Sequence, residues 1–172
     1  MSYPQEISNS AFIAPKASII DDIKIGARSG IWYNCELRGD MYEIRIVENS
    51  NVQDSTVLRI ASLGQGTYIG SRVSIGQFAL IHACTVEDGA MTGMEASVVH
   101  GALIKAGELV AAGSLVSTGK RVLKGQMWVG TPTKYIRDVS QSDQGMIDYI
   151  LPVFLDLAGE NVVSGLDACK PK

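Results

Sequence analysis

Residues 67–86 read TYIGSRVSIGQFALIHACTV, which places isoleucine at positions 69, 75 and 81 before a shorter step leads to Val86. The same spacing of six residues extends outward in both directions. Of the nineteen positions in this series, eighteen carry Ile, Leu or Val and only Thr92 is polar. The series comprises Ile7, Ile13, Ile19, Ile25, Ile31, Leu37, Ile46, Val52, Leu58, Ile69, Ile75, Ile81, Val86, Thr92, Val98, Ile104, Val110, Val116 and Val122.

A period of six matches neither the 3.6 residues of a helix turn nor the two-residue alternation of an isolated strand. It is typical of a hexapeptide solenoid, in which each hexad forms one short strand and a corner, and the aliphatic residue points inward. The sequence therefore predicts an all-β solenoid. Three hexads to a coil is the usual arrangement, so we assign the hexads to three faces.

This assignment predicts which outward side chains stack. The first face has Ile19, Leu37, Leu58, Ile81, Val98 and Val116 inward, and the second has Ile13, Ile31, Val52, Ile75, Thr92 and Val110 inward. Equivalent residues of successive coils are expected about 4.8 Å apart. Polar columns of this kind need solvent or a neighbouring subunit to satisfy them. The predicted columns are Arg38, Arg59, His82 and Val99 on the first face, and Asp54 and Gln77 on the second.

Two interruptions of the repeat predict loops. The step from Leu37 to Ile46 adds three residues within 38–45, and the step from Leu58 to Ile69 adds five around 62–67. Insertions between repeats are expected to leave the stack at a corner, where functional residues tend to lie.

After Val122 the repeat fades, and a helix is expected with Ser140 or Ser142 as its N-cap. Its apolar residues fall at helical spacing, whereas Pro152 predicts a kink or a split near Leu151. We predict a single domain, with a β-helix over 1–136 and a C-terminal helix and tail over 137–172 packed on it. The tail from Gly159 onward is expected to be loose. The apolar residues are Met146, Ile147, Ile150, Leu151, Phe154 and Leu157.

Composition limits the function classes. A net charge of −3 and a pI near 5.3 argue against binding to nucleic acid or to an anionic membrane surface. Cys35, Cys84 and Cys169 are widely spaced, which predicts free thiols in a reducing compartment. No signal-peptide pattern and no long apolar run is seen in the sequence, so we expect a cytoplasmic or mitochondrial matrix protein that is not secreted and does not span a membrane.

Four strings of the sequence carry a resemblance to a known family: WYNCELRGD at 32–40, NVQD at 51–54, IGQFALIHACTV at 75–86 and WVGTPTK at 128–134. They resemble the γ-class carbonic anhydrases, including the relatives found in mitochondrial respiratory complex I. The resemblance covers roughly residues 7–140. It implies a left-handed parallel β-helix, a homotrimer or heterotrimer, and a C-terminal helix packed along the solenoid. In enzymes of that family, three histidines at a subunit interface hold zinc or iron, two from one subunit and one from the next.

By this resemblance, the three metal-ligand positions fall on Arg59, Gln77 and His82. Only His82 retains a side chain suited to binding the metal, because a guanidinium has no available lone pair and an amide is a weak ligand for zinc. His100, the only other histidine, lies one coil beyond His82 without an evident third ligand. We therefore expect no resident cofactor, unless zinc or iron is held by a rebuilt site or by one shared with a paralogue.

The resemblance also matches Arg38, Asp40, Gln53 and Asp54 to a polar network around the metal. Such residues either orient substrate or pair across the subunit interface, and with the ligands replaced the interface role is favoured. Arg59 would then stand in for the metal cation, within reach of Asp40 and Asp54.

These features favour a non-catalytic γ-carbonic anhydrase-like trimer subunit with a degenerate metal site, acting in the assembly of a larger complex such as complex I. One alternative is a divergent metal-dependent carbonic anhydrase that hydrates carbon dioxide. A hexapeptide acyltransferase is less favoured, because His82 lies in the anhydrase-like string and not in a catalytic loop.

Overall fold

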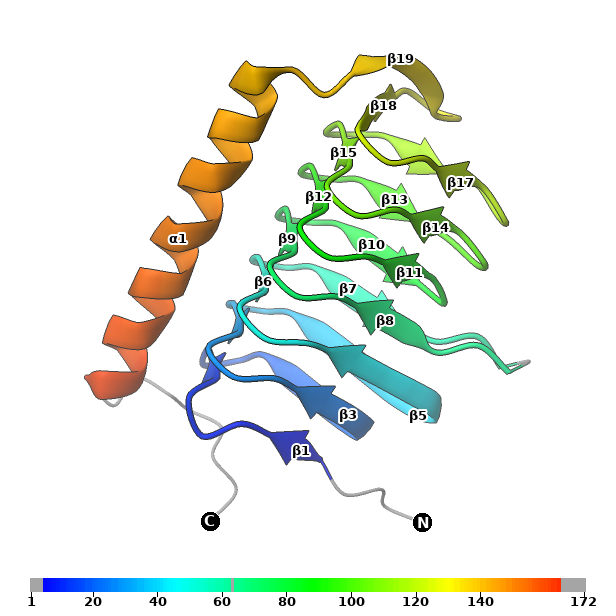
Figure 1. Cartoon of the computed structure of the whole chain (residues 1–172). Coiled ribbons are helices and arrows are strands. Elements are labelled where there is room, and N and C mark those ends of the chain that lie inside the picture. Colours follow the sequence, from blue (N-terminus) through cyan, green and yellow to red (C-terminus); the bar gives the residue numbers. More distant parts are fainter. Residues whose placement is uncertain (1–4, 63, 165–172) are drawn as a thin grey trace.

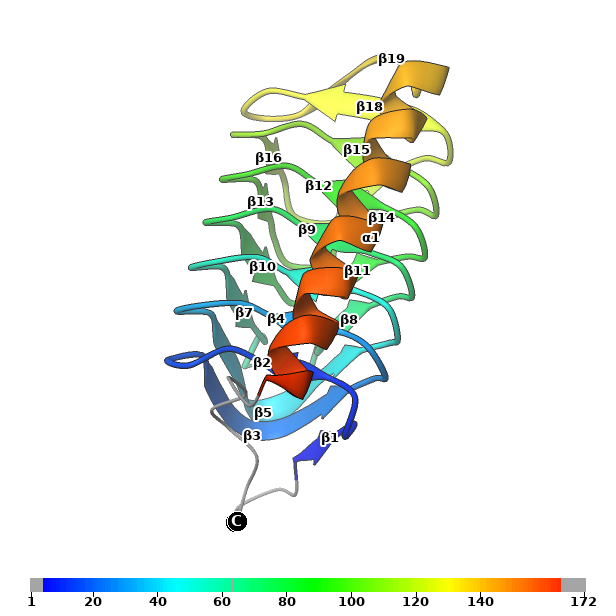
Figure 2. The ribbon, with the colours of Figure 1, turned by 90° about the vertical axis from the view of Figure 1, so that its left-hand side faces the viewer.

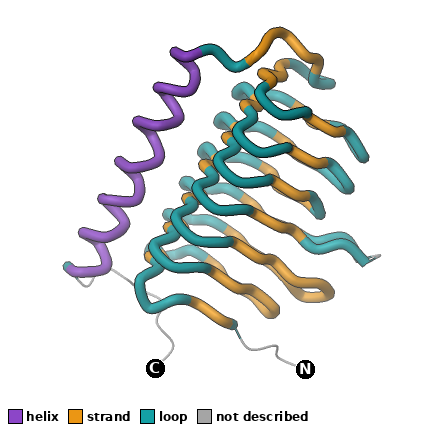
Figure 3. The backbone as a smooth tube through the Cα atoms, viewed as in Figure 1, coloured by secondary structure: helices purple, strands orange, loops and turns teal. Residues whose placement is uncertain are grey.

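The computed structural model is a left-handed parallel β-helix with one helix along its side, and it describes residues 5–62 and 64–164 (Figure 1). Most strands span only two or three residues and are separated by corners (Figure 3). The second face is an eight-stranded sheet. Its strands are β2 (Phe12–Ile13), β4 (Gly30–Ile31), β6 (Asn51–Val52), β9 (Ser74–Ile75), β12 (Met91–Thr92), β15 (Leu109–Val110), β18 (Gln126–Val129) and β19 (Lys134–Asp138).

The first and third faces form one eleven-stranded sheet, because β3 (Ser18–Ile25) and β5 (Glu36–Ile46) continue from one face to the next. The shorter strands of the first face are β7 (Val57–Arg59), β10 (Leu80–His82), β13 (Ser97–Val98) and β16 (Leu115–Val116). Those of the third face are β1 (Glu6–Ile7), β8 (Thr67–Ile69), β11 (Thr85–Val86), β14 (Leu103–Ile104) and β17 (Arg121–Val122).

The strand register confirms the predicted inward columns. On the first face Leu37 pairs with Leu58, and Leu58 pairs with Ile81. On the second face Val52 pairs with Ile75, which pairs with Thr92. All six side chains are fully buried, so the six-residue repeat builds one continuous core along the solenoid axis.

The prediction of a loop at 38–45 is wrong, because these residues lie within β5. The strand continues through the extra residues by pairing with β3, which has a register shift between Asp21 and Ile23. Close approach of the two strands explains Gly39, where a Cβ atom would lie 2.6 Å from the carbonyl oxygen of Asp22. The second insertion does form a loop between β7 and β8, closed by a bridge between Ala61 and Gln65, and its Leu63 lies outside the described residues.

The helix α1 (Gln141–Val163) lies along the second face, against β2, β4, β6 and β9 (Figure 2). Ser140 is its N-cap, as one of the two predicted candidates. The helix runs through Pro152 without splitting, since packing of Ile147, Leu151 and Ala158 on either side of the proline holds both halves to the solenoid. Tertiary packing thus outweighs the hydrogen bond that proline removes. The expectation of a loose tail from Gly159 is wrong as far as Val163, and residues 165–172 lie outside the description.

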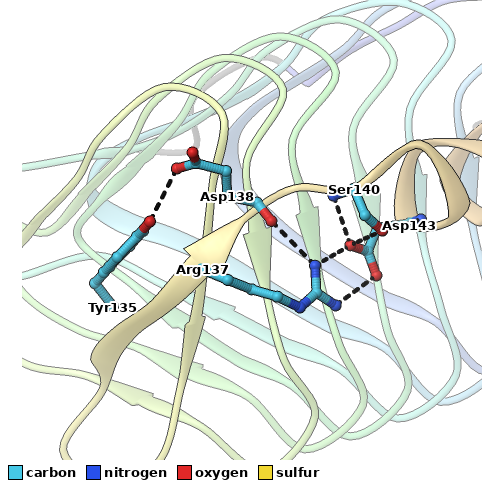
Figure 4. A network of polar contacts seen from close by, with 5 residues as sticks. All are labelled: Tyr135, Arg137, Asp138, Ser140 and Asp143. Carbon is cyan, nitrogen blue, oxygen red and sulfur yellow. Dashed lines mark hydrogen bonds and ion pairs between the residues drawn. The ribbon is translucent and has the colours of Figure 1, made fainter.

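An antiparallel hairpin of β18 and β19 covers the C-terminal end of the solenoid and leads into α1. Figure 4 shows how its last residues meet the helix: Arg137 forms an ion pair with Asp143, whose carboxylate also accepts from the backbone N–H of Ser140 at 2.8 Å. These partners hold the pKa of Asp143 well below its usual range. The pairing fixes the start of the helix.

Cys35 and Cys84 are free and buried, and burial raises the pKa of each thiol to about 12, whereas Cys169 lies outside the described residues. No helix among the described residues combines the length and apolar character needed to cross a membrane.

Candidate functional site

The predicted column on the first face exists. Arg38 of β5, Arg59 of β7 and His82 of β10 are direct register partners on three adjacent parallel strands. Each follows the inward aliphatic residue of its strand, so the three side chains leave the solenoid on the same side. All three are partly exposed in the single chain.

Two ion pairs neutralise the arginines of this column. The Nε and Nη2 atoms of Arg38 lie 2.7 and 2.6 Å from Oδ2 of Asp40. The Nη1 atom of Arg59 lies 3.2 Å from Oε1 of Glu36. Asp40 and Asp54 are the partners that the sequence led us to expect for Arg59. The structure pairs it with Glu36 instead. The Arg59 guanidinium is thus directed toward the neighbouring strand β5, which carries Glu36.

Sequence reasoning missed Glu36. The register pairs Glu36 with Val57, so Arg59 is two residues further along the neighbouring strand. Such diagonal neighbours lie within reach of long side chains. The repeat therefore contained the information needed to pair Glu36 with Arg59. It was missed because only residues at equivalent positions of successive hexads were compared.

Gln53 belongs to a different polar group. Its side chain is 3% exposed, and its amide nitrogen donates to Oδ1 of Asn51 at 3.0 Å. Asn51 in turn donates to Oγ of Ser74 at 2.9 Å. This buried chain lies on the second face, so the four predicted network residues do not form one cluster: Arg38 and Asp40 pair on the first face and Gln53 binds within the second.

Asp54 and Gln77 lie at the corner between the second and first faces. The backbone N–H of Phe78 donates to the carbonyl of Asp54 at 3.0 Å, which stacks these corners as predicted. Gln77 is partly exposed and lines an apolar groove of about 520 Å³ between α1 and the second face. We name it the methionine groove after Met91, Met94, Met127 and Met146, which line it.

The donor set of this chain does not fit a metal centre of three histidines. Across the described parts of the chain, no group of three or more His, Cys, Asp or Glu side chains is placed to hold a metal ion. His82 is half-buried in β10, and His100 is exposed in the corner that follows β13. At the other two positions stand a guanidinium, which is already paired with Glu36, and an amide.

Comparisons with known proteins identify close relatives. The chain is 38% identical to gamma carbonic anhydrase 2, mitochondrial, of Arabidopsis thaliana, over 88% of this chain and 56% of that protein. It is 42% identical to a protein of Methanocaldococcus jannaschii named "Probable carbonic anhydrase", over 80% of this chain and 86% of that protein. The chain thus spans little more than half the length of the plant relative. No family model matches the chain.

A solved structure shares nearly the whole fold. A candidate acetyltransferase from Bacillus cereus superposes with a TM-score of 0.91 at 30% identity, covering 94% of this chain and 93% of that one. The solenoid and its helix are therefore a common scaffold of proteins named for two different activities.

Proposed function

Because the chain belongs to the γ-carbonic anhydrase-like family of hexapeptide-repeat proteins, we propose that it is a non-catalytic trimer subunit whose metal site has been replaced by ion pairs. The observation that carries this proposal is the pairing of Arg59 with Glu36 at a position where the resemblance expects a histidine. A cation at a ligand position repels a metal ion as well as failing to bind it.

The proposed role is structural. The first-face column leaves polar side chains for a neighbouring subunit to cover. The methionine groove leaves apolar side chains in the same way. Three plant relatives are named as mitochondrial, which supports a mitochondrial location over a cytoplasmic one. The larger assembly that we propose for the chain is one such as complex I.

A mixed trimer would keep part of the family's metal chemistry. If each site takes two ligands from one subunit and one from the next, this chain affects both interfaces that it forms. In a trimer with two relatives that carry all three histidines, only the site between those relatives is complete. Such a complex should bind about one metal ion per trimer, following the usual requirement for three protein ligands.

The test combines metal analysis with native mass spectrometry of the purified, self-assembled protein. We expect trimers with far less than one zinc ion per subunit, and carbon dioxide hydration close to background. The double variant Arg59→His/Gln77→His should raise zinc toward about one per site. A matched control, Arg121→His/Gln144→His, adds the same residues away from the column and should not.

Other results would change the proposal. Stoichiometric zinc with rapid hydration of carbon dioxide in the unmodified protein would establish the divergent enzyme instead. A folded, trimeric double variant that takes up no zinc would show that Arg59 and Gln77 do not occupy ligand positions. A monomer at micromolar concentration would remove the subunit role.

Acyl transfer is the second candidate, favoured by the 30% identical neighbour from Bacillus cereus and by the apolar groove beside Gln77. It predicts that acetyl-CoA binds and that His82→Ala changes this binding or its turnover. Acetyl-CoA binding that is absent, or unaffected by His82→Ala, would argue against it.

A further inference from the structure

Glu108 is a fully buried acid, and most of the residues at the equivalent position of other coils are alanine or serine. It occupies the corner two positions before the inward Val110, where the coil below has Ala90 and the coil above has Gln126. Its exposed fraction is 0%. The other members of this column are Ala11, Ser29, Ser50, Val73, Ala90 and Gln126.

Among the described residues, neither carboxyl oxygen of Glu108 has a hydrogen-bond partner. The two serines of the same column differ in this respect, since Ser29 donates to the carbonyl of Val47 at 2.7 Å and Ser50 donates to that of Gly70 at 2.7 Å. An ionised carboxylate without partners is costly in an apolar interior, and such a group takes up a proton instead. Glu108 is therefore held as a neutral acid.

The surrounding charges do not offset this burial. Glu87 and Lys105 pair with each other at 2.8 Å, and the second oxygen of Glu87 accepts from the N–H of Ala106 at 3.2 Å. Burial first, and Glu87 second, raise the pKa of Glu108 to about 8, whereas Lys105 opposes the shift.

In the next coil, the side chains of Lys120 and Gln126 both contact Trp128. The ammonium of Lys120 lies 4.5 Å from the centre of the Trp128 ring. The Gln126 side-chain oxygen accepts from the indole N–H of the same tryptophan at 2.9 Å. Trp128 closes the end of the core, and it belongs to β18, which pairs with β15 on one side and β19 on the other.

We propose that Glu108 is a proton-operated latch on the C-terminal end of the solenoid. With its proton bound, the carboxyl group stays inside and β18 remains paired with β15. When the proton is lost, the carboxylate gains solvation only if the end coil opens, so the β18–β19 hairpin separates and the start of α1 loses its anchor. Opening is cheapest here because, within the described part of the chain, the hairpin alone covers this end of the solenoid (Figure 1).

The direction of the pH dependence follows from linkage. The pKa of Glu108 is higher in the folded chain, at about 8, than its ordinary value of 4.5. Its contribution to stability is fully present below that ordinary value and declines as the pH rises, until it is lost above the folded value. Between these limits, the open-to-closed ratio of the end coil should rise by up to about tenfold per pH unit.

The test is hydrogen exchange of the Gln126–Asp138 amides between pH 6 and pH 9, in the full chain and in Glu108→Gln. Taking the ratio of the two proteins at each pH removes the intrinsic pH dependence of exchange. We expect the ratio to increase with pH in these amides and to stay constant in β3 and β5. The control Asp156→Asn, at an exposed position of α1, should exchange like the unmodified chain.

Glu108→Ala provides a second variant, since alanine already occupies this position in the coil below. Like Glu108→Gln, this variant has no carboxyl group at position 108, so the opening of its end coil should not depend on pH. A ratio that does not change with pH would overturn the proposal. So would a carboxyl titration of Glu108, followed by carbon-13 NMR in the unmodified chain, that has its midpoint near the ordinary value. The latch is independent of the metal question, because neither readout involves Arg59, Gln77 or His82.

Discussion

Leu58 and Arg59 are consecutive residues of β7, yet they obey different constraints. Leu58 is fully buried between Leu37 and Ile81, whereas the Arg59 side chain is 37% exposed and touches one acid of the neighbouring strand. The inward column must fill a core of fixed width, and its residues are aliphatic at every position of the repeat except Thr92. The outward column meets no such requirement within one chain. Departures from a family pattern can therefore collect there without loss of the fold, and they report on function.

The largest expected effect comes from shortening the inward residue. Leu58→Ala removes three buried carbon atoms and leaves a cavity between two neighbouring coils, which should lower the free energy of unfolding by about 2–5 kcal/mol. Val57→Ala, one residue earlier on the half-buried outer side, is the matched control and should cost less than about 1 kcal/mol. Chemical denaturation of the three proteins at one concentration measures the difference. Equal losses would show that the two sides of β7 are not distinct.

A smaller effect is expected where two long strands approach each other. Gly39→Ala would place its Cβ atom 2.6 Å from the carbonyl oxygen of Asp22 and 3.1 Å from that of Tyr42, so the backbone of β3 or β5 must move. We expect a loss of about 1–3 kcal/mol. Gly145→Ala in α1 is the control of opposite sign, because no atom lies within 4 Å and helix propensity favours alanine by roughly 1 kcal/mol. Thermal unfolding should move down for the first and up for the second.

The fold was predictable because its dominant constraint is periodic. A residue that must be aliphatic every six positions identifies the inward column, and with it the register of Leu37, Leu58 and Ile81. The path of residues 38–45 was not predictable in this way. Counting extra residues shows that the chain leaves the repeat, but pairing between β3 and β5 decides whether those residues form a loop or a longer strand. Similarly, Pro152 predicts a kink or a split, and packing on both sides of the proline keeps the helix from splitting.

The candidate site was predictable only in part. The stacking of Arg38, Arg59 and His82 follows from the same period. The partner of Arg59 does not, because a long side chain can reach several neighbours and its choice of Glu36 depends on side-chain direction. The burial of Glu108 was not predicted, because only the aliphatic positions of the hexads were compared and their corner residues were not.

The smallest expected effect tests whether the outward column contributes to stability at all. A double-mutant cycle of Arg59→Ala and Glu36→Ala isolates the coupling energy of the pair. Both side chains are substantially exposed, at 37% and 43%, and one contact of 3.2 Å joins them. Pairs of this kind contribute about 0.2–1 kcal/mol, and added salt should reduce the value further. The unfolding measurements need a single protein concentration, because assembly links stability to concentration. A coupling energy above about 2 kcal/mol would exceed what an exposed pair supplies. Stability of the fold would then be reason enough for an arginine at position 59, and its place at the proposed ligand position would no longer support the loss of the metal site.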